Sequence, residues 1–270
     1  MNAPRNADAW RVAALTMMEP QALADLLCGD PVTAAPWIAA AARLDIAEAQ
    51  VRLGRMLLAG EGVEENKAAA FAWFARAADA GNIEAQNMLG RCCEHGWGVP
   101  CSAERAASWY TRAAEAGDAW AQYNLGHLHL DGIGVPRDAD AAFRWYSCAA
   151  AQGHARAMSL VGRCYEEGWG TARNIAEACD WYRRSAEAGY FRGAFNYASL
   201  LAADGFEAEA VQWFARAVSL APDDKRETLI VAWRAATRSS KTFSRESRSR
   251  IPRETSSPEG CVRRAVLPNA

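Results

Sequence analysis

The sequence predicts an all-α fold, a right-handed superhelical α-solenoid of about five to six helix-turn-helix repeats. Pairs of glycines separated by one residue recur at intervals of 36 residues, and tryptophans recur with the same period. The glycine pairs are Gly60/Gly62, Gly96/Gly98, Gly132/Gly134 and Gly168/Gly170, and the tryptophans are Trp73, Trp109, Trp145 and Trp181. A fixed period of this length is typical of stacked supersecondary units that each contact their neighbours.

The unit from Ile83 to Asp118 indicates how one repeat is built. Apolar residues four positions apart predict a first helix over 83–95. The segment Gly96–Pro100 ends it, because two glycines allow positive φ in a tight turn and a proline blocks helix continuation. A second helix is expected over 103–116, followed by Gly117 in a left-handed conformation. Each unit therefore reads helix, turn, helix, turn.

The second helices carry small and large apolar residues side by side. Paired alanines recur where helix backbones approach each other, next to pairs of large aromatic residues. The aromatic pairs are Trp73-Phe74, Trp109-Tyr110, Trp145-Tyr146, Trp181-Tyr182 and Trp213-Phe214. Because small and large side chains interdigitate at native packing density, we expect these residues, the tryptophans included, to lie mostly in the core.

The repeated segments carry a family resemblance. They read AQNMLG…HGWGVP…AASWYTRAAEAGD in one unit and AQYNLG…DGIGVPRDADAAFRWYSCAAAQGH in the next. This pattern resembles the Sel-one-like repeat family, relatives of the tetratricopeptide repeat, over about Ala49 to Ala221. The last unit departs from it, because Ala198 occupies the glycine column and the Gly-x-Gly turn is missing. That unit is more similar to an ordinary tetratricopeptide repeat.

The periodic pattern also predicts how the chain is divided. We expect an N-terminal extension over 1–20, a repeat region over 21–221, a capping helix over 222–237 and a tail over 238–270. Full repeats are expected at 47–82, 83–118, 119–154 and 155–190, with degenerate units at 21–46 and 191–221. In the capping helix, Leu229, Ile230 and Trp233 are expected to point inward.

Charge is distributed unevenly along the chain. The net charge is −2, but the residues from Arg234 onward carry +6 and the others −8. The tail is rich in Ser, Arg and Pro, a composition typical of disorder. There are two alternatives to disorder. The tail is a basic arm that binds nucleic acid or an acidic partner, or it is an artefact of the reading frame.

The sequence has no long apolar run that would span a membrane and no signal-peptide layout at its start. A cytoplasmic, bacterial protein is therefore expected, with a periplasmic or secreted location as the alternative.

Four side chains suggest a metal site at first sight. Cys92, Cys93, His95 and Cys101 lie within ten residues, and zinc prefers such ligands. Adjacent cysteines on a helix, however, point about 100° apart, and no Cys-x-x-Cys pair is present. Buried thiols are therefore expected, with no metal and no other cofactor.

The resemblance raises one enzymatic alternative. Some secreted members of the family bind or cleave β-lactams and carry regularly spaced cysteine pairs. In this chain Arg156 occupies the position where the second cysteine of a pair with Cys148 would lie. Neither of the motifs Ser-x-x-Lys and Gly-x-Ser-x-Gly, which mark serine nucleophiles, occurs in the sequence. We expect no catalytic residues, and an exported β-lactam- or cell-wall-related hydrolase or binder remains an alternative.

The resemblance further implies that the first helix of each unit lines a concave groove. One column of residues projected there is Arg55, Arg91, His127, Arg163 and Ser199, and its neighbour is Arg52, Met88, Asn124, Leu160 and Asn196. Trp120, Tyr123 and Phe195 are expected to add aromatic surface to it.

This combination of side chains suits a peptide ligand. Arginine binds carboxylates, asparagine pairs with peptide groups and aromatic rings bury side chains. We therefore expect a non-enzymatic adaptor that binds a partner's peptide or helix in the groove, with a nucleic-acid accessory factor acting through the basic tail as a further alternative. The competing interpretation of Arg91 and Arg163 is ordinary i,i+3 pairing with Glu94 and Glu166.

Overall fold

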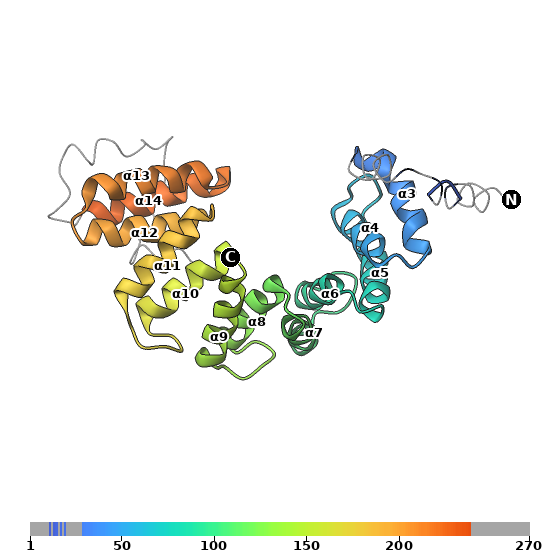
Figure 1. Cartoon of the computed structure of the whole chain (residues 1–270), viewed down its shortest axis with the longest axis horizontal. Coiled ribbons are helices and arrows are strands. Elements are labelled where there is room, and N and C mark those ends of the chain that lie inside the picture. Colours follow the sequence, from blue (N-terminus) through green and yellow to red (C-terminus); the bar gives the residue numbers. More distant parts are fainter. Residues whose placement is uncertain (1–10, 12, 16, 18, 20–28, 239–270) are drawn as a thin grey trace. The chain divides into compact units, whose positions relative to one another are not determined.

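A computed structural model describes residues 11, 13–15, 17, 19 and 29–238 (Figure 1). From residue 29 onward the described helices are α3 (Pro31–Arg43), α4 (Ala47–Ala59), α5 (Lys67–Asp79), α6 (Ile83–His95), α7 (Ala103–Glu115), α8 (Ala119–Asp131), α9 (Ala139–Ala151), α10 (Ala155–Glu167), α11 (Ile175–Glu187), α12 (Phe191–Ala203), α13 (Glu207–Leu220) and α14 (Asp223–Arg238). The described ranges contain no strand, which confirms the all-α prediction. Most of the expected extension 1–20, the start of the unit at 21–46 and the tail beyond Arg238 lie outside the described residues.

The described residues form two compact units, one that ends at Arg137 and one that begins at Asp138. The first contains α3 to α8, and each of these helices packs on the next one along the chain. The second contains α9 to α14, packed in the same way, with α14 covering both α12 and α13. Within each unit the helices therefore stack as successive pairs, as the sequence period predicts.

Local chemistry sets the ends of the helices. Asn82, Ser102 and Asp118 each accept a hydrogen bond from the backbone N–H three residues later, at 2.9, 3.2 and 2.6 Å. Such N-caps satisfy donors that have no partner inside the helix. At the other end of α6, Gly96 adopts the left-handed conformation with φ of 71°. The predicted helix over 83–95 is confirmed by α6.

The second glycine of each turn marks where consecutive pairs touch. A Cβ on Gly98 would lie 2.2 Å from the carbonyl oxygen of Lys67, the first residue of α5. Gly62 stands in the same relation to Pro31, the first residue of α3, at 2.3 Å. Because the two contacts are equivalent, α3 takes the place of the second helix of a repeat that precedes α4.

The aromatic pairs separate into a buried and a partly exposed member. Phe74, Tyr110, Tyr146, Tyr182 and Phe214 are fully enclosed, with at most 1% of their surface exposed. The preceding tryptophans are partly buried, and Trp73, Trp109 and Trp213 pack against the core clusters. The expectation that they lie mostly in the core is thus met only in part, because they border the core and do not fill it. Adjacent helix residues point about 100° apart. At Phe74, Tyr110 and Tyr182 the second residue of the pair is the one that faces the first helix of its repeat, where its ring lies against a glycine.

The two rings of an aromatic pair have different neighbours: a glycine lies against the buried ring, and an arginine covers the partly exposed one. A Cβ on Gly90 would lie 2.6 Å from the Tyr110 ring, so a glycine in α6 makes room for the buried aromatic. The Trp109 ring is covered instead by the Arg112 guanidinium, 4.6 Å from the ring centre. The same Arg-on-Trp contact recurs at 4.8–4.9 Å for Arg76 on Trp73, Arg184 on Trp181 and Arg216 on Trp213.

Candidate functional site

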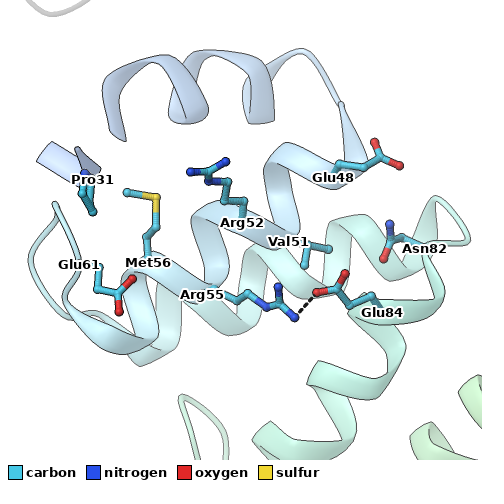
Figure 2. A pocket seen from close by; sticks show the side chains of 9 residues that line it. All are labelled: Pro31, Glu48, Val51, Arg52, Arg55, Met56, Glu61, Asn82 and Glu84. Carbon is cyan, nitrogen blue, oxygen red and sulfur yellow. Dashed lines mark ion pairs between the residues drawn. The ribbon is translucent and has the colours of Figure 1, made fainter. Parts of the chain in front are cut away.

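In the first unit, two neighbouring hollows lie along α4 and α6, and both include Arg55. The α4 hollow, about 380 Å³, is lined by Pro31, Glu48, Val51, Arg52, Arg55, Met56, Glu61, Asn82 and Glu84 (Figure 2). The Trp97 hollow, about 450 Å³, is lined by Arg55, Leu58, Ala59, Glu65, Lys67, Met88, Arg91 and Trp97. Three of the groove residues predicted from the sequence, Arg55, Met88 and Arg91, thus line the Trp97 hollow.

Charges of both signs meet in the α4 hollow. Arg55 of α4 and Glu84 of α6 point toward each other and form an ion pair (Figure 2). Arg52 lines the same hollow, and so do Glu48 and Glu61. The lining thus contains two arginines and three glutamates, and the Arg55–Glu84 pair ties the first helices of consecutive repeats together.

The Trp97 hollow is built around a stacked guanidinium. The Arg91 guanidinium lies 5.2 Å from the centre of the Trp97 ring, and its Nη1 atom lies 3.8 Å from the Met88 sulfur. Trp97 stands between Gly96 and Gly98, both in the left-handed conformation with φ of 71° and 72°. The turn thus places an aromatic ring beside a cation of α6, and such stacking holds the cation in place.

The competing interpretation, an ion pair between Arg91 and Glu94, does not describe these side chains. The Glu94 carboxylate accepts a hydrogen bond from the Tyr110 hydroxyl, 2.6 Å away. Glu166 accepts one from Tyr182 in the second unit, at 2.7 Å. Burial, reinforced by the adjacent carboxylate, raises the pKa of both tyrosines above the usual value, so both phenols remain neutral donors.

Aromatic side chains follow one another along α8. The Trp120 and Tyr123 rings meet edge to face with centres 6.2 Å apart, and Tyr123 meets His127 at 4.6 Å. Trp120 is 48% exposed. Asn124 donates a hydrogen bond to the Asn87 side chain, at 3.2 Å, and so links α8 to α6. Sequence reasoning missed Asn87, although it occupies the repeat position that holds Tyr123 one unit later.

The second unit repeats part of this arrangement. The Arg163 guanidinium lies 4.7 Å from the Trp169 ring centre, the same pairing as Arg91 with Trp97. Asn196 and Ser199 are partly exposed on α12, whereas Leu160 is buried at 7% exposure.

One predicted groove residue belongs to the core instead. Phe195 has no exposed surface, and its ring packs against Phe214 at 6.3 Å and Trp233 at 6.2 Å. The prediction that Phe195 faces a ligand is therefore wrong, because α13 and α14 enclose the position. Met88 is also largely buried, with 4% of its surface exposed, although it reaches the floor of the Trp97 hollow.

The described cysteines carry free thiols. Cys92 and Cys93 are buried, and burial raises the pKa of Cys92 to about 12. In the part of the chain that the structure describes, Cys92, Cys93, Cys101, Cys148, Cys164 and Cys179 are free. No group of three or more metal-ligating side chains converges among these described residues.

His154 is used as a helix cap. Its Nδ1 atom accepts a hydrogen bond from the Ala157 N–H, at 3.1 Å, at the start of α10. Burial and the nearby Arg156 lower its pKa to about 4. A neutral imidazole is required for this role, because only the unprotonated nitrogen accepts a hydrogen bond.

Comparison with known proteins gives one family and several related folds. The Sel1 repeat profile matches residues 47–82, 83–118, 121–154, 155–190 and 207–221. A Sel1 repeat protein from Oxalobacter formigenes is similar over 93% of this chain and 95% of its own, with 25% identity and a TM-score of 0.67. A protective antigen of uropathogenic Escherichia coli with an SLR fold is similar over 91% of this chain, with 24% identity and a TM-score of 0.67.

The chain spans 52% of the length of that antigen. A search of curated proteins found no match. Among the described helices, none combines the length and the apolar character that crossing a bilayer requires.

Proposed function

This chain belongs to the Sel1 repeat family, whose helical solenoids commonly serve as protein-interaction scaffolds, and we propose that it is a non-enzymatic adaptor. In this proposal, a peptide or helix of a partner protein binds along the first helices of the repeats. The predicted contact residues are Arg55, Met88, Arg91, Trp120, Tyr123, Asn124, His127, Arg163 and Asn196.

The observation that carries the proposal is the Trp97 hollow. It brings a cation, an aromatic ring and aliphatic side chains to one surface of about 450 Å³. Interfaces that bind peptides combine these side-chain types, with aromatic and arginine residues providing most of the binding energy. The aromatic residues of α8 support the same interpretation, since Trp120 is 48% exposed at the helix surface.

Affinity capture with charge-reversal variants tests the proposal. The full chain, immobilised, is compared with a variant carrying Arg91→Glu and Arg163→Glu, and bound proteins from the native cell's lysate are identified by mass spectrometry. The matched control carries Arg112→Glu and Arg184→Glu, which also remove guanidinium groups stacked on tryptophans, at 4.6 and 4.8 Å.

A partner retained by the parent and the control but lost from the Arg91/Arg163 variant supports the adaptor function. Equal capture by all three chains contradicts the assignment of these residues. Far-UV circular dichroism confirms that each variant keeps its helices.

We also propose a cytoplasmic location, consistent with the free thiols among the described residues. Cell fractionation followed by a thiol count under denaturing conditions tests it. Recovery in an exported fraction with oxidised cysteines contradicts it and favours the β-lactam-related alternative.

A further inference from the structure

We infer that the Trp97 hollow receives a carboxylate that stands next to an apolar side chain in the bound peptide. This inference rests on the proposed adaptor function and specifies the chemistry of its ligand. It follows from how the charges that line the hollow are compensated.

Of the cations that line the hollow, Arg91 is the one that forms no ion pair with another described residue. Arg55 forms an ion pair with Glu84 across α4 and α6, and Lys67 forms one with Glu65 at 3.1 Å. The contacts of Arg91 are the neutral Trp97 ring and the Met88 sulfur. Its charge therefore remains available to an anion.

The stacking prepares Arg91 for such a ligand. A guanidinium that lies on an aromatic ring keeps its in-plane N–H groups at the edge, where a carboxylate binds with two parallel hydrogen bonds. The ring itself is held by a turn in which Gly96 and Gly98 both have positive φ. A cation positioned before binding loses little conformational entropy when the ligand arrives.

The other residues that line the hollow indicate why the peptide should carry an apolar side chain next to its carboxylate. Leu58 and Ala59 of α4 and the Trp97 ring border the cavity, so a bound carboxylate has aliphatic and aromatic surface beside it. A volume of about 450 Å³ falls within the size range of pockets that enclose small ligands and side chains.

The adjacent α4 hollow offers the opposite environment. Glu48, Glu61 and Glu84 line it together with two arginines, and Arg55 is already paired with Glu84. A further acidic group is disfavoured there, because like charges repel. Selectivity for a carboxylate is thus confined to the part of the surface around Arg91.

Selection from random peptide libraries tests the inference. Heptapeptides displayed with a blocked C-terminus, and a second library with free C-termini, are panned on the immobilised full chain. Enriched sequences are then synthesised as peptides, and each is paired with a version in which Asp or Glu is replaced by Asn or Gln, or the terminal carboxylate by an amide. The two libraries distinguish a side-chain carboxylate from a terminal one.

Binding of these peptides is measured to the parent chain, to Arg91→Gln and to Arg112→Gln. Arg112 also stacks on a tryptophan, at 4.6 Å, but it does not line the hollow, so its variant controls for loss of a stacked guanidinium. We expect enriched peptides to carry a carboxylate beside an apolar residue, and both its neutralisation and Arg91→Gln to weaken binding about tenfold or more. Arg112→Gln should leave the affinity unchanged.

Enriched peptides that lack a carboxylate, or that bind Arg91→Gln as tightly as the parent, overturn the inference and leave the adaptor function standing. If no peptide is enriched from either library, the proposed function fails, and the inference fails with it.

Discussion

At the scale of single residues, Tyr110 illustrates how one repeat differs from its neighbours. Its hydroxyl donates to the Glu94 carboxylate at 2.6 Å. In the preceding repeat the equivalent positions hold Phe74 and Leu58, two apolar residues of the same hydrophobic cluster. Tyrosine with glutamate and phenylalanine with leucine are therefore two solutions to the same packing position.

Replacement of Tyr110 tests this interpretation. We expect Tyr110→Phe to lower the free energy of unfolding by about 1–2 kcal/mol, because the partly buried Glu94 loses its charge-assisted hydrogen bond. The double variant Tyr110→Phe/Glu94→Leu should recover most of that loss, since it reproduces the pair of the preceding repeat. Urea unfolding followed by circular dichroism measures both. A double variant no more stable than Tyr110→Phe contradicts the explanation.

His154 makes stability depend on pH. Its pKa is lowered from 6.5 to about 4 in the folded chain, so between these values the unfolded chain binds more protons. Its stabilising contribution is therefore complete above about pH 6.5 and decreases as the pH falls toward 4. We expect about 1 kcal/mol to be lost from this residue between pH 7 and pH 5, once partial exposure of the ring is allowed for.

An asparagine at position 154 provides the control for this effect, because Asn82 caps the equivalent helix α6 without a titrating side chain. His154→Asn should retain the cap and remove this share of the pH dependence, so the difference in unfolding free energy between pH 7 and pH 5 becomes smaller. Urea denaturation of both chains at each pH measures it. Identical pH dependence in the two chains refutes the role of the imidazole.

At the scale of helices and turns, the second glycine of each turn is the contact between consecutive pairs. A Cβ on Gly98 would lie 2.2 Å from the Lys67 carbonyl oxygen, whereas a Cβ on Gly117 would have nothing within 4 Å. Both residues have positive φ, of 72° and 97°. Gly117 therefore requires glycine only for its backbone conformation, whereas Gly98 requires it also because there is no space for a Cβ. Comparing the two positions separates these effects.

We expect Gly117→Ala to cost about 1 kcal/mol, the price of a left-handed alanine. Gly98→Ala should cost at least about 2 kcal/mol more, because backbone atoms rather than a flexible side chain must move. Thermal and urea unfolding of the two variants provide the comparison. Equal losses would show that the close approach at Gly98 does not matter.

The helices were predictable because their signals are local. The glycine turns and the apolar spacing predict the helix over 83–95, and α6 has the same bounds. The burial of Tyr110 rather than Trp109 depends on how two helices are rotated against each other, which no local pattern specifies. Phe195 was assigned to the ligand surface because sequence spacing does not reveal that α14 covers α12.

The candidate site was predictable only in part, for the same reason. The repeat columns identified Arg55, Met88 and Arg91, which line the Trp97 hollow. They did not identify Trp97 as the partner of Arg91, because that contact joins a helix to the turn that follows it. A tryptophan between the two glycines of the turn, also found at Trp169, is the signal that could have indicated it.

At the scale of the whole molecule, a chain of stacked repeats derives its stability from neighbouring contacts rather than from one common core. The last described helix, α14, packs on the preceding helices of the second unit. Its Trp233 is fully buried and stacks on Phe214 of α13, with ring centres 4.6 Å apart and planes 7° apart. It also contacts Phe195 of α12 at 6.2 Å. One side chain therefore holds the last three helices together.

We expect Trp233→Ala to remove about 3–5 kcal/mol of local stability and to loosen α12, α13 and α14 before the rest of the chain. Contacts between neighbours confine the effect, so amides of α9 and α10 should keep their protection while those of the last three helices exchange faster. Hydrogen exchange read by mass spectrometry measures this, with Val231→Ala, an exposed position on the same helix, as the control. Uniform acceleration along the second unit would instead indicate that it unfolds as a single cooperative block.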